Sequence, residues 1–548
     1  MHINRLYFKF ILVVSVLLFA SEGLLAQKVW ENPNKEIYQF LSRQAQKGNI
    51  DLDDLIQPYS RKDIAFHLSK LDSLRTQLSP IEIKELDFYR QEYAEFNDGA
   101  VDEVSFLKKD QHGRLRFLAV RKDDFILNGD PTLSIYGIQG TQRSITGIAN
   151  GAQFWGQAGK HIAFQAGFTD NTEKGDGIDK LKSFTPETGV VRTEGNDPKS
   201  LNFSDFRGSA TYNWQNGSIS VGYDQLTFGY GANGKLVLSD KAPAAPFIRL
   251  DYKPLKWLSF NYIHTWLNSA IIDSNATYNK GNPIYGDVRE SYIQKYMASH
   301  SLTFYPTKGL SLTAGESVIY TDKLEAGYLF PLMFFKVYDQ HASRYKISTG
   351  SNSQFFFQAS SRNLIKNTHL YATLFIDEIS FTNAFNAQKS RNQLGYNLGA
   401  SVTDIGIPYL TIGAEYTRLN PFNYQNLIPA QNYTHHDYTL GDWMGANADR
   451  FLAYLKYTPI SRLKTSLTIQ SVRKGNPGSL LDQYFKEPQP KFLDDYQFKQ
   501  NLLQLNIGYE VIHNLYFNAN YQHISLSTIS TNTKQTTNNF KFGLSLGF

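Results

Sequence analysis

Phe540–Phe548 (FKFGLSLGF) is the stretch that decides the fold class of this chain. Phe540, Phe542, Leu544, Leu546 and Phe548 alternate with Lys, Gly and Ser. Alternation with a period of two is the pattern of a β-strand whose two faces meet different surroundings. The stretch therefore predicts a last strand with one apolar face and one polar face.

A terminal strand that ends on Phe resembles the insertion signal of bacterial outer-membrane β-barrels. The other end agrees, because Arg5 and Lys9 precede the apolar run Phe10–Ala20, which has the length of a signal-peptide core. We expect residues 1–26 to be a signal peptide that is cleaved after Ala26. No other apolar run approaches the roughly 20 residues of a spanning helix, so a membrane would have to be crossed by strands.

The composition argues against several classes of function. The 548 residues include no Cys, which argues against disulfides, a lipid-anchored Cys and Cys-based metal or redox centres. Aromatic residues make up 14% of the chain, as suits the interfacial girdles of a membrane barrel. A net charge of +5 is small for this length and argues against a nucleic-acid partner.

Residues 27–98 differ from the rest and predict a small periplasmic helical bundle. Asn34–Lys47 has an apolar face, and Ser60 is the expected N-cap of a second helix. Ser79 and Glu82 have the spacing of a capping box that opens a third helix. The bundle would either bind a periplasmic partner or act as a stabilising lid.

From about residue 130 the chain consists of alternating segments separated by two kinds of connection. Short turns follow a Tyr, as at Tyr252, Tyr305, Tyr457 and Tyr509, where an interfacial aromatic residue is expected. Long polar connections are expected near 170–202, 267–295, 321–352, 418–448, 472–499 and 524–537. This asymmetry is typical of outer-membrane barrels, whereas a soluble β-sandwich or propeller would not explain it.

Counting from a first strand near 133–140 gives about eighteen antiparallel strands. We therefore predict an all-β transmembrane barrel over residues 133–548, preceded by the helical bundle. Residues 99–132 are left over as a linker or plug segment, in which 113–128 could form a periplasmic hairpin, a lumen plug or an extra strand pair.

Several motifs together resemble the Wzi capsule-assembly family over nearly the whole chain after the signal peptide. They are Gly222–Gly234 with the following Leu236–Phe247, Glu316–Tyr320 with Tyr328–Phe334, Leu374–Glu378, and above all Glu415–Asn447 (EYTRLNPFNYQ through YTHHDYTLGDWMGAN). The resemblance implies an eighteen-stranded outer-membrane barrel, a periplasmic bundle and lectin-like binding of capsular polysaccharide. Phe330 departs from the family pattern, in which a polar Asn is more usual before the Pro. The Tyr–Pro turns resemble those of Bacteroidetes membrane proteins.

Sugar recognition requires aromatic faces and planar polar groups that reach two hydroxyls at once. The connection 418–448 contains both kinds of residue. The glycan-binding candidates are Arg418, Asn420, Tyr424, Tyr433, Asp437, Tyr438, Trp443 and Asn447. An alternative is that this aromatic-rich loop folds over the barrel mouth for its own stability.

Two carboxylates are candidates for the lumen. Glu415 alternates with Ala414 and Tyr416 on the opposite face, and it would lie near Arg418 in a salt-bridged plug contact or a selectivity element. Glu316 shares its register with Leu312, so strict alternation would point it at lipid. We expect either a bulge at Gly315 that turns Glu316 inward or a position near the outer rim.

The remaining motifs give no enzyme, metal or cofactor. His435 and His436 are adjacent, so on a strand they would face opposite sides, and further zinc ligands at suitable spacing are missing. Asp170–Lys180 departs from a calcium loop at Lys174. Neither a nucleophile elbow nor a phosphate-binding loop is found, which leaves an outer-membrane hydrolase as a weak third hypothesis.

The leading hypothesis is a non-enzymatic protein of the Gram-negative outer membrane that binds or helps assemble capsular polysaccharide through its extracellular loops. Its expected partners are surface polysaccharide, membrane lipid, the barrel-insertion machinery and a periplasmic protein at the bundle. The alternative is a porin-like channel for small polar solutes, because eighteen strands enclose a wide lumen.

Overall fold

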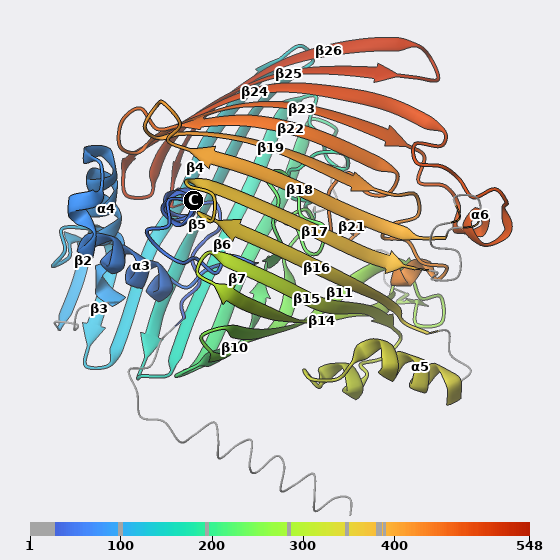
Figure 1. Cartoon of the computed structure of the whole chain (residues 1–548), viewed down its shortest axis with the longest axis horizontal. Helices are drawn as coiled ribbons and strands as arrows, with labels where there is room; N and C mark the ends of the chain where they lie inside the picture. Colours follow the sequence, from blue (N-terminus) through green and yellow to red (C-terminus); the bar gives the residue numbers. More distant parts are fainter. Residues whose placement is uncertain are drawn as a thin grey trace, which may run out of the picture.

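The computed structural model describes residues 28–96, 102–191, 197–281, 287–345, 350–379, 386, 389 and 391–547, with only the backbone of 342–345. The predicted signal peptide and Phe548 lie outside these described residues. The chain forms a closed antiparallel β-barrel, with the N-terminal helices at one end and the long connections at the other (Figure 1).

Eighteen strands close the barrel, as the sequence predicts. In pairing order they are β4(Phe125–Gly140), β5(Arg143–Ala158), β6(Ile162–Asp176), β7(Ser200–Trp214), β8(Gly217–Asp224), β10(Ala245–Leu255), β11(Leu258–Ile272), β14(Tyr292–Thr307), β15(Leu310–Thr321), β16(Asn352–Arg362), β17(Thr368–Glu378), β18(Gln393–Thr403), β19(Leu410–Leu419), β22(Ala448–Tyr457), β23(Leu463–Gly475), β24(Tyr496–Ile512), β25(Leu515–Thr528) and β26(Thr533–Leu546). Leu546 of β26 pairs with Leu133 of β4, so no strand edge is left open in the ring.

Short turns join the strands at one end, and most long connections lie at the other. One expected loop, 524–537, is wrong, because β25 and β26 continue through it and meet in a short turn after Thr528. Two connections on the long-loop side, 225–244 and 379–392, were missed from the sequence. The first of them, described throughout, proves to be central to the lumen.

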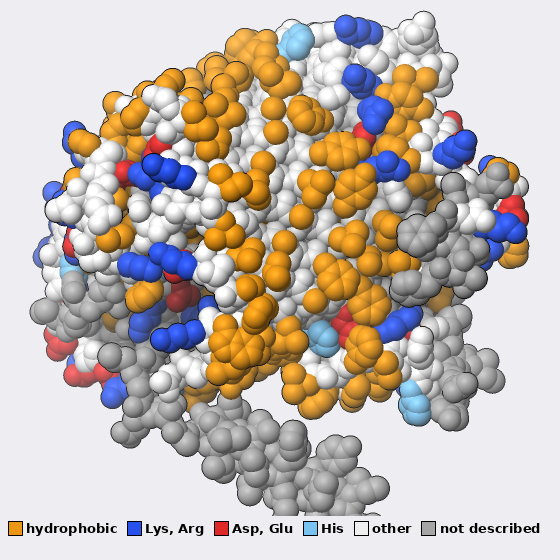
Figure 2. Space-filling view, viewed as in Figure 1, with side chains coloured by type: hydrophobic (Ala, Val, Ile, Leu, Met, Phe, Trp, Pro, Cys, Tyr) orange, Lys and Arg blue, Asp and Glu red, His pale blue; other side chains and the backbone are white. Residues whose placement is uncertain are grey.

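A band of apolar side chains covers the outer wall of the barrel (Figure 2). Leu302, Phe357, Leu398, Ile469 and Phe542 are exposed on it, while their strand neighbours of opposite parity face the lumen. A barrel has this alternation where lipid meets its outside, because the strands satisfy one another's backbone groups. No helix among the described residues has the length and hydropathy needed to cross a bilayer.

Three helices form the expected N-terminal bundle: α2(Ile37–Gln46), α3(Arg61–Ser73) and α4(Pro80–Tyr93). Ser60 caps α3, and Ser79 with Glu82 forms a complete capping box on α4. The three apolar faces share one core, in which Leu41 is fully buried. Burying one such side chain stabilises the bundle by about 1.5–3 kcal/mol.

The bundle closes the short-turn end of the barrel. Arg43 donates to both carboxylate oxygens of Asp404 at 2.6 Å, in the turn between β18 and β19. Glu85 accepts from Tyr409 and from Lys464 on β23. Because these contacts reach several turns around the barrel, the bundle is fixed against the rim.

Residues 103–122 form a hairpin outside the ring of eighteen. Its strands are β2(Glu103–Lys109) and β3(Leu115–Lys122), and β3 pairs with the first part of β4. Arg116 is fully buried beside Glu92 of α4, and the closest carboxylate oxygen of Glu92 lies 3.1 Å from the guanidinium. Burial alone would raise the pKa of Glu92, but Arg116, Arg114 and Arg61 lower it well below its usual range.

The smaller elements belong to the connections. They are β1(Ile56–Gln57), η1(Arg75–Gln77), η2(Ala94–Phe96), β9(Thr227–Phe228), β12(Tyr278–Asn279), β13(Val288–Arg289), η4(Ala326–Leu329), α5(Phe335–Tyr345), η6(Pro429–Gln431), β20(Thr434–His435), β21(Tyr438–Thr439) and α6(Leu480–Phe485).

Candidate functional site

The lumen is filled by two connections that enter from the long-loop end. Residues 225–244, between β8 and β10, and 420–447, between β19 and β22, pack against each other and against the inner wall. From the opposite end, Ile56 of β1 pairs with Phe228 of β9. We call the two connections the plug, because together with the N-terminal segment they form one buried apolar cluster inside the barrel.

An ionic cluster ties the plug to the wall. Arg450 of β22 is fully buried and donates to Asp442 of the plug at 2.9 Å and to Glu415 of β19 at 3.1 Å. Glu415 also accepts from the backbone N–H of Ala232 and from the Tyr371 hydroxyl, both at 2.6 Å. Glu415 thus lies in the lumen, but its cationic partner is Arg450 rather than the expected Arg418.

Four of the eight glycan candidates lie inside the plug. Tyr424, Tyr433, Trp443 and Asn447 are each less than 5% exposed. The Tyr433 hydroxyl donates to the Val237 carbonyl at 2.7 Å, and the Trp443 indole N–H donates to the Asn233 carbonyl at 2.8 Å. In this conformation the three aromatic side chains join the two plug connections and offer no ring face to a sugar. The Asn447 side chain instead donates to the carbonyls of Asn476 and Asp494, in the connection between β23 and β24.

Two candidates lie on a small hairpin of the plug, formed by β20 and β21. Asp437 at its tip is exposed, and Tyr438 is half-buried. The Tyr438 hydroxyl donates to the Leu181 carbonyl at 2.8 Å, and the Lys241 ammonium lies 5.1 Å from its ring centroid. The pKa of Lys241 is lowered to about 8 by burial, against the opposing effect of Glu187.

The last two candidates, Arg418 and Asn420, line a pocket of about 260 Å³ at the rim. The Arg418 guanidinium lies 3.7 Å from the ring centroid of Phe492, and its Nε donates to the Asn420 side chain at 3.1 Å. Arg391 lines the same pocket from the connection before β18. The rim pocket therefore brings two guanidinium groups, an amide and an aromatic ring together from the end of β19 and three connections.

The lumen assignment of Glu316 is wrong. Glu316 pairs with His300 in an unbroken stretch of the β14–β15 ladder, so no bulge at Gly315 turns it inward. It shares the outer face with Leu302 and Leu312, yet it is only 2% exposed. A later connection of the chain covers it, which strand alternation alone could not predict.

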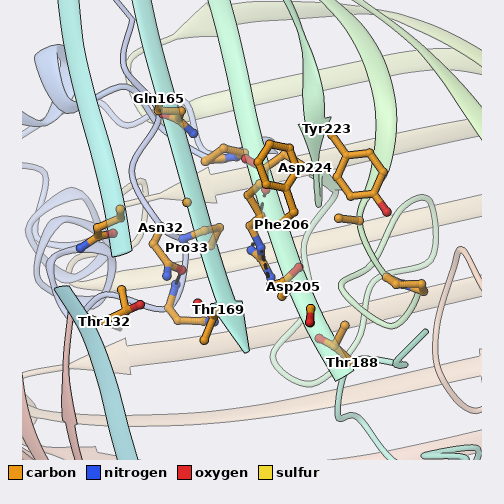
Figure 3. Close-up of a pocket in the computed structure, with 18 of the residues that line it drawn as sticks. Asn32, Pro33, Thr132, Gln165, Thr169, Thr188, Asp205, Phe206, Tyr223 and Asp224 are labelled. Carbon is orange, nitrogen blue, oxygen red and sulfur yellow. Dashed lines mark hydrogen bonds and ion pairs between the residues drawn. The ribbon is translucent and has the colours of Figure 1, made fainter. Parts of the chain in front are cut away.

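A larger cavity of about 750 Å³ lies between the plug and the wall formed by β5–β8 (Figure 3). Gln165, Asp205 and Asp224 line it from neighbouring strands. The Arg207 Nε donates to Asp205 at 2.9 Å, and the Gln165 side chain accepts from the backbone N–H of Trp30 at 2.7 Å. Inward strand parity is the sequence signal for these residues, and every other lumen-facing position shares it.

The adjacent histidines are used within the plug. His435 is buried and its Nδ1 accepts from the backbone N–H of Asn268 at 2.8 Å. Within the described part of the chain, no three His, Asp or Glu side chains gather in an arrangement that could hold a metal ion.

Comparisons with known proteins place this architecture. The sequence matches the family described as Capsule assembly protein Wzi over residues 191–541. Among solved structures, the chain is similar to Escherichia coli Wzi, described as an outer membrane protein involved in group 1 capsule assembly and a carbohydrate-binding β-barrel. That match has a TM-score of 0.57 at 13% identity and covers 95% of this chain and 100% of the other.

Other barrels match less well. Pseudomonas aeruginosa OccK8 (OprE) matches with a TM-score of 0.43 at 11% identity, over 77% of this chain and 97% of the other. Among curated proteins, none matches the sequence. Because the family match spans more than half of the chain, the protein belongs to the Wzi capsule assembly family.

Proposed function

We propose that this protein resides in the outer membrane and binds or helps assemble capsular or related surface polysaccharide at its long-loop end. The observation that carries the proposal is the family match over residues 191–541, which includes both plug connections and most of the barrel. The apolar band on the outer wall and the likeness to a carbohydrate-binding barrel support it.

The rim pocket is the surface that suits a glycan best. Arg418 and Arg391 would pair with the carboxylates of acidic sugars, since a guanidinium matches a carboxylate in two-pronged geometry. Asn420 would bind hydroxyls, and Phe492 would support the apolar face of a ring. Asp437 and Tyr438 form a second contact region, while the buried members of the original candidate set position the loops.

The plug makes the channel alternative weaker. Over the described residues, an apolar cluster and a buried ionic cluster occupy the lumen between the two ends. We propose a binding role without an enzymatic step or a cofactor. We also propose the barrel-insertion machinery and a periplasmic protein at the bundle as partners. We further propose a Bacteroidetes-type origin, which the Tyr–Pro turns and the Ala26-Gln27-Lys28 signal end support.

A strain that lacks the protein tests the proposal. We expect the total polysaccharide to be unchanged but shifted from the cell surface to the medium. Complementation with Arg418→Ala should restore retention only in part, whereas Arg143→Ala, at the long-loop end of β5, should restore it fully. Normal retention in the deletion strain would overturn the proposal.

A further inference from the structure

The connection between β15 and β16 follows a different course from the plug. It leaves the long-loop end and folds back over the outer wall, where α5 lies alongside the barrel (Figure 1). Its cluster contains Tyr262, Tyr296, Ala298, Val318, Tyr320, Tyr328 and Phe335. Tyr328 and Phe335 belong to the connection, and the other five lie on β11, β14 and β15 with the parity that is exposed elsewhere on the barrel. The connection therefore covers a part of the apolar band.

The covered surface includes a carboxylate at the depth of the membrane. Glu316 is six positions beyond Leu310, where β15 begins. With about 2.4 Å of height per tilted strand residue, this places Glu316 about 15 Å up a lipid-facing band that is about 25 Å tall. A carboxylate at that height would be costly if it faced acyl chains.

The start of α5 satisfies this carboxylate. Glu316 accepts from the backbone N–H of Phe335 at 2.5 Å and from that of Lys336 at 3.4 Å. His300 pairs with Glu316 across the β14–β15 ladder, and its Nε2 lies 3.2 Å from the Glu316 carboxylate. Since the N-terminus of a helix favours negative charge, α5 and Glu316 fix each other against the wall.

The outer surface of the same connection is strongly apolar. Phe330, Leu332, Phe334 and Val337 are all exposed, with Leu332 at 69%. The Phe334 ring lies 6.1 Å from that of Phe355, which belongs to the outer face of β16 next to the exposed Phe357. The apolar surface of the connection is therefore continuous with the apolar band of the barrel.

We propose that residues 326–341 form an embedded flap: a segment that lies within the outer leaflet, with Phe330, Leu332, Phe334 and Val337 among the lipid acyl chains. The flap replaces lipid over Glu316 and His300 and restores an apolar surface outside them. Its occupant is the acyl-chain layer of the membrane, because the surface continues the lipid-facing wall rather than the mouth. The inference relies on the proposed location of the barrel in a membrane.

Spin labelling tests the flap, since the chain has no Cys and a single introduced Cys is uniquely labelled. A nitroxide at Leu332→Cys would be compared in phosphatidylcholine vesicles with one at Leu302→Cys on the lipid-facing wall. Thr531→Cys, at the tip of the turn between β25 and β26, provides the water reference. All three positions are exposed, so the substitutions do not disturb a core.

We expect the label at position 332 to match position 302, with high oxygen accessibility and a nickel-chelate accessibility several-fold below that at 531. A second label at Val337→Cys should behave in the same way. If the labels at 332 and 337 were as accessible to nickel as the label at 531, while the label at 302 was shielded from nickel, the flap alone would be overturned. A nickel-accessible 302 would overturn the membrane location on which it relies.

Discussion

Replacing Arg450 with Met should open the plug. Arg450 is fully buried and is the cation that holds both Asp442 of the plug and Glu415 of the wall. Its removal leaves two buried carboxylates without a countercharge, a change that costs about 3–5 kcal/mol. At about 1.4 kcal/mol per factor of ten, the population of barrels with a displaced plug should rise by two to three powers of ten or more.

The assay is single-channel conductance in a planar bilayer, alongside hydrogen exchange at the Ala232 amide, which donates to Glu415. We expect a silent parent protein, and an Arg450→Met variant with intermittent openings and loss of protection at Ala232. Lys199→Met is the control, because Lys199 and Asp176 form an ion pair at the long-loop end in which the two side chains are 66% and 64% exposed, and such a pair contributes little to stability. If Arg450→Met were as silent and as protected as the control, the ionic cluster would not hold the plug.

Three further predictions concern the plug and the helical bundle. Gly234→Ala should open channels intermittently, as Arg450→Met does. Gly234 has a φ of +135°, and a Cβ there would lie 2.3 Å from the Asp442 carboxylate. A Gly234→Ala variant without channel openings would contradict this prediction. Leu41→Ala should destabilise the bundle by about 2–5 kcal/mol and expose it to proteolysis, while the heat-dependent gel shift of the barrel stays unchanged. Burial alone would raise the pKa of Glu82, but Arg43 and Lys47 lower it to about 2. The stability from this contact is therefore complete above the unfolded pKa of about 4.3 and is lost as the pH falls towards 2. The protection factors of the α4 amides, which correct for the pH dependence of the intrinsic exchange rate, should be the same at pH 7 and pH 5 and lower at pH 2.5.

The local elements of this fold follow from short-range patterns in the sequence. The alternation in Phe540–Leu546 is realised in β26, and Ser60 and Ser79 open helices because their side chains satisfy the first free N–H groups. The count of eighteen strands could be reached because alternating segments are separated by recognisable short turns and long polar connections, and four of the short turns follow a Tyr. These signals depend on neighbours within a few residues, so they survive without knowledge of the tertiary structure.

The paths of the long connections could not be predicted in the same way. Tyr433 and Trp443 have the composition of a sugar-binding loop, yet their partners are carbonyls of residues about 200 positions earlier in the chain. For Glu316, alternation correctly gives the outer face, but the covering helix begins only at Phe335 and is not fixed by the strand pattern. Where a side chain points is a local property, whereas what covers it is not.

The width of the barrel explains why these loops turn inward. Eight strands enclose an interior that side chains alone can fill, but eighteen enclose a much wider lumen, so chain segments must enter it if it is to be closed. The aromatic residues of 420–447 meet this requirement, because Tyr and Trp bury large apolar areas while their polar groups reach backbone carbonyls. The aromatic richness of the loop is therefore accounted for by the plug itself. We therefore expect glycan contacts to come from groups that the plug leaves at the surface, such as Arg418, Asn420 and their neighbours at the rim.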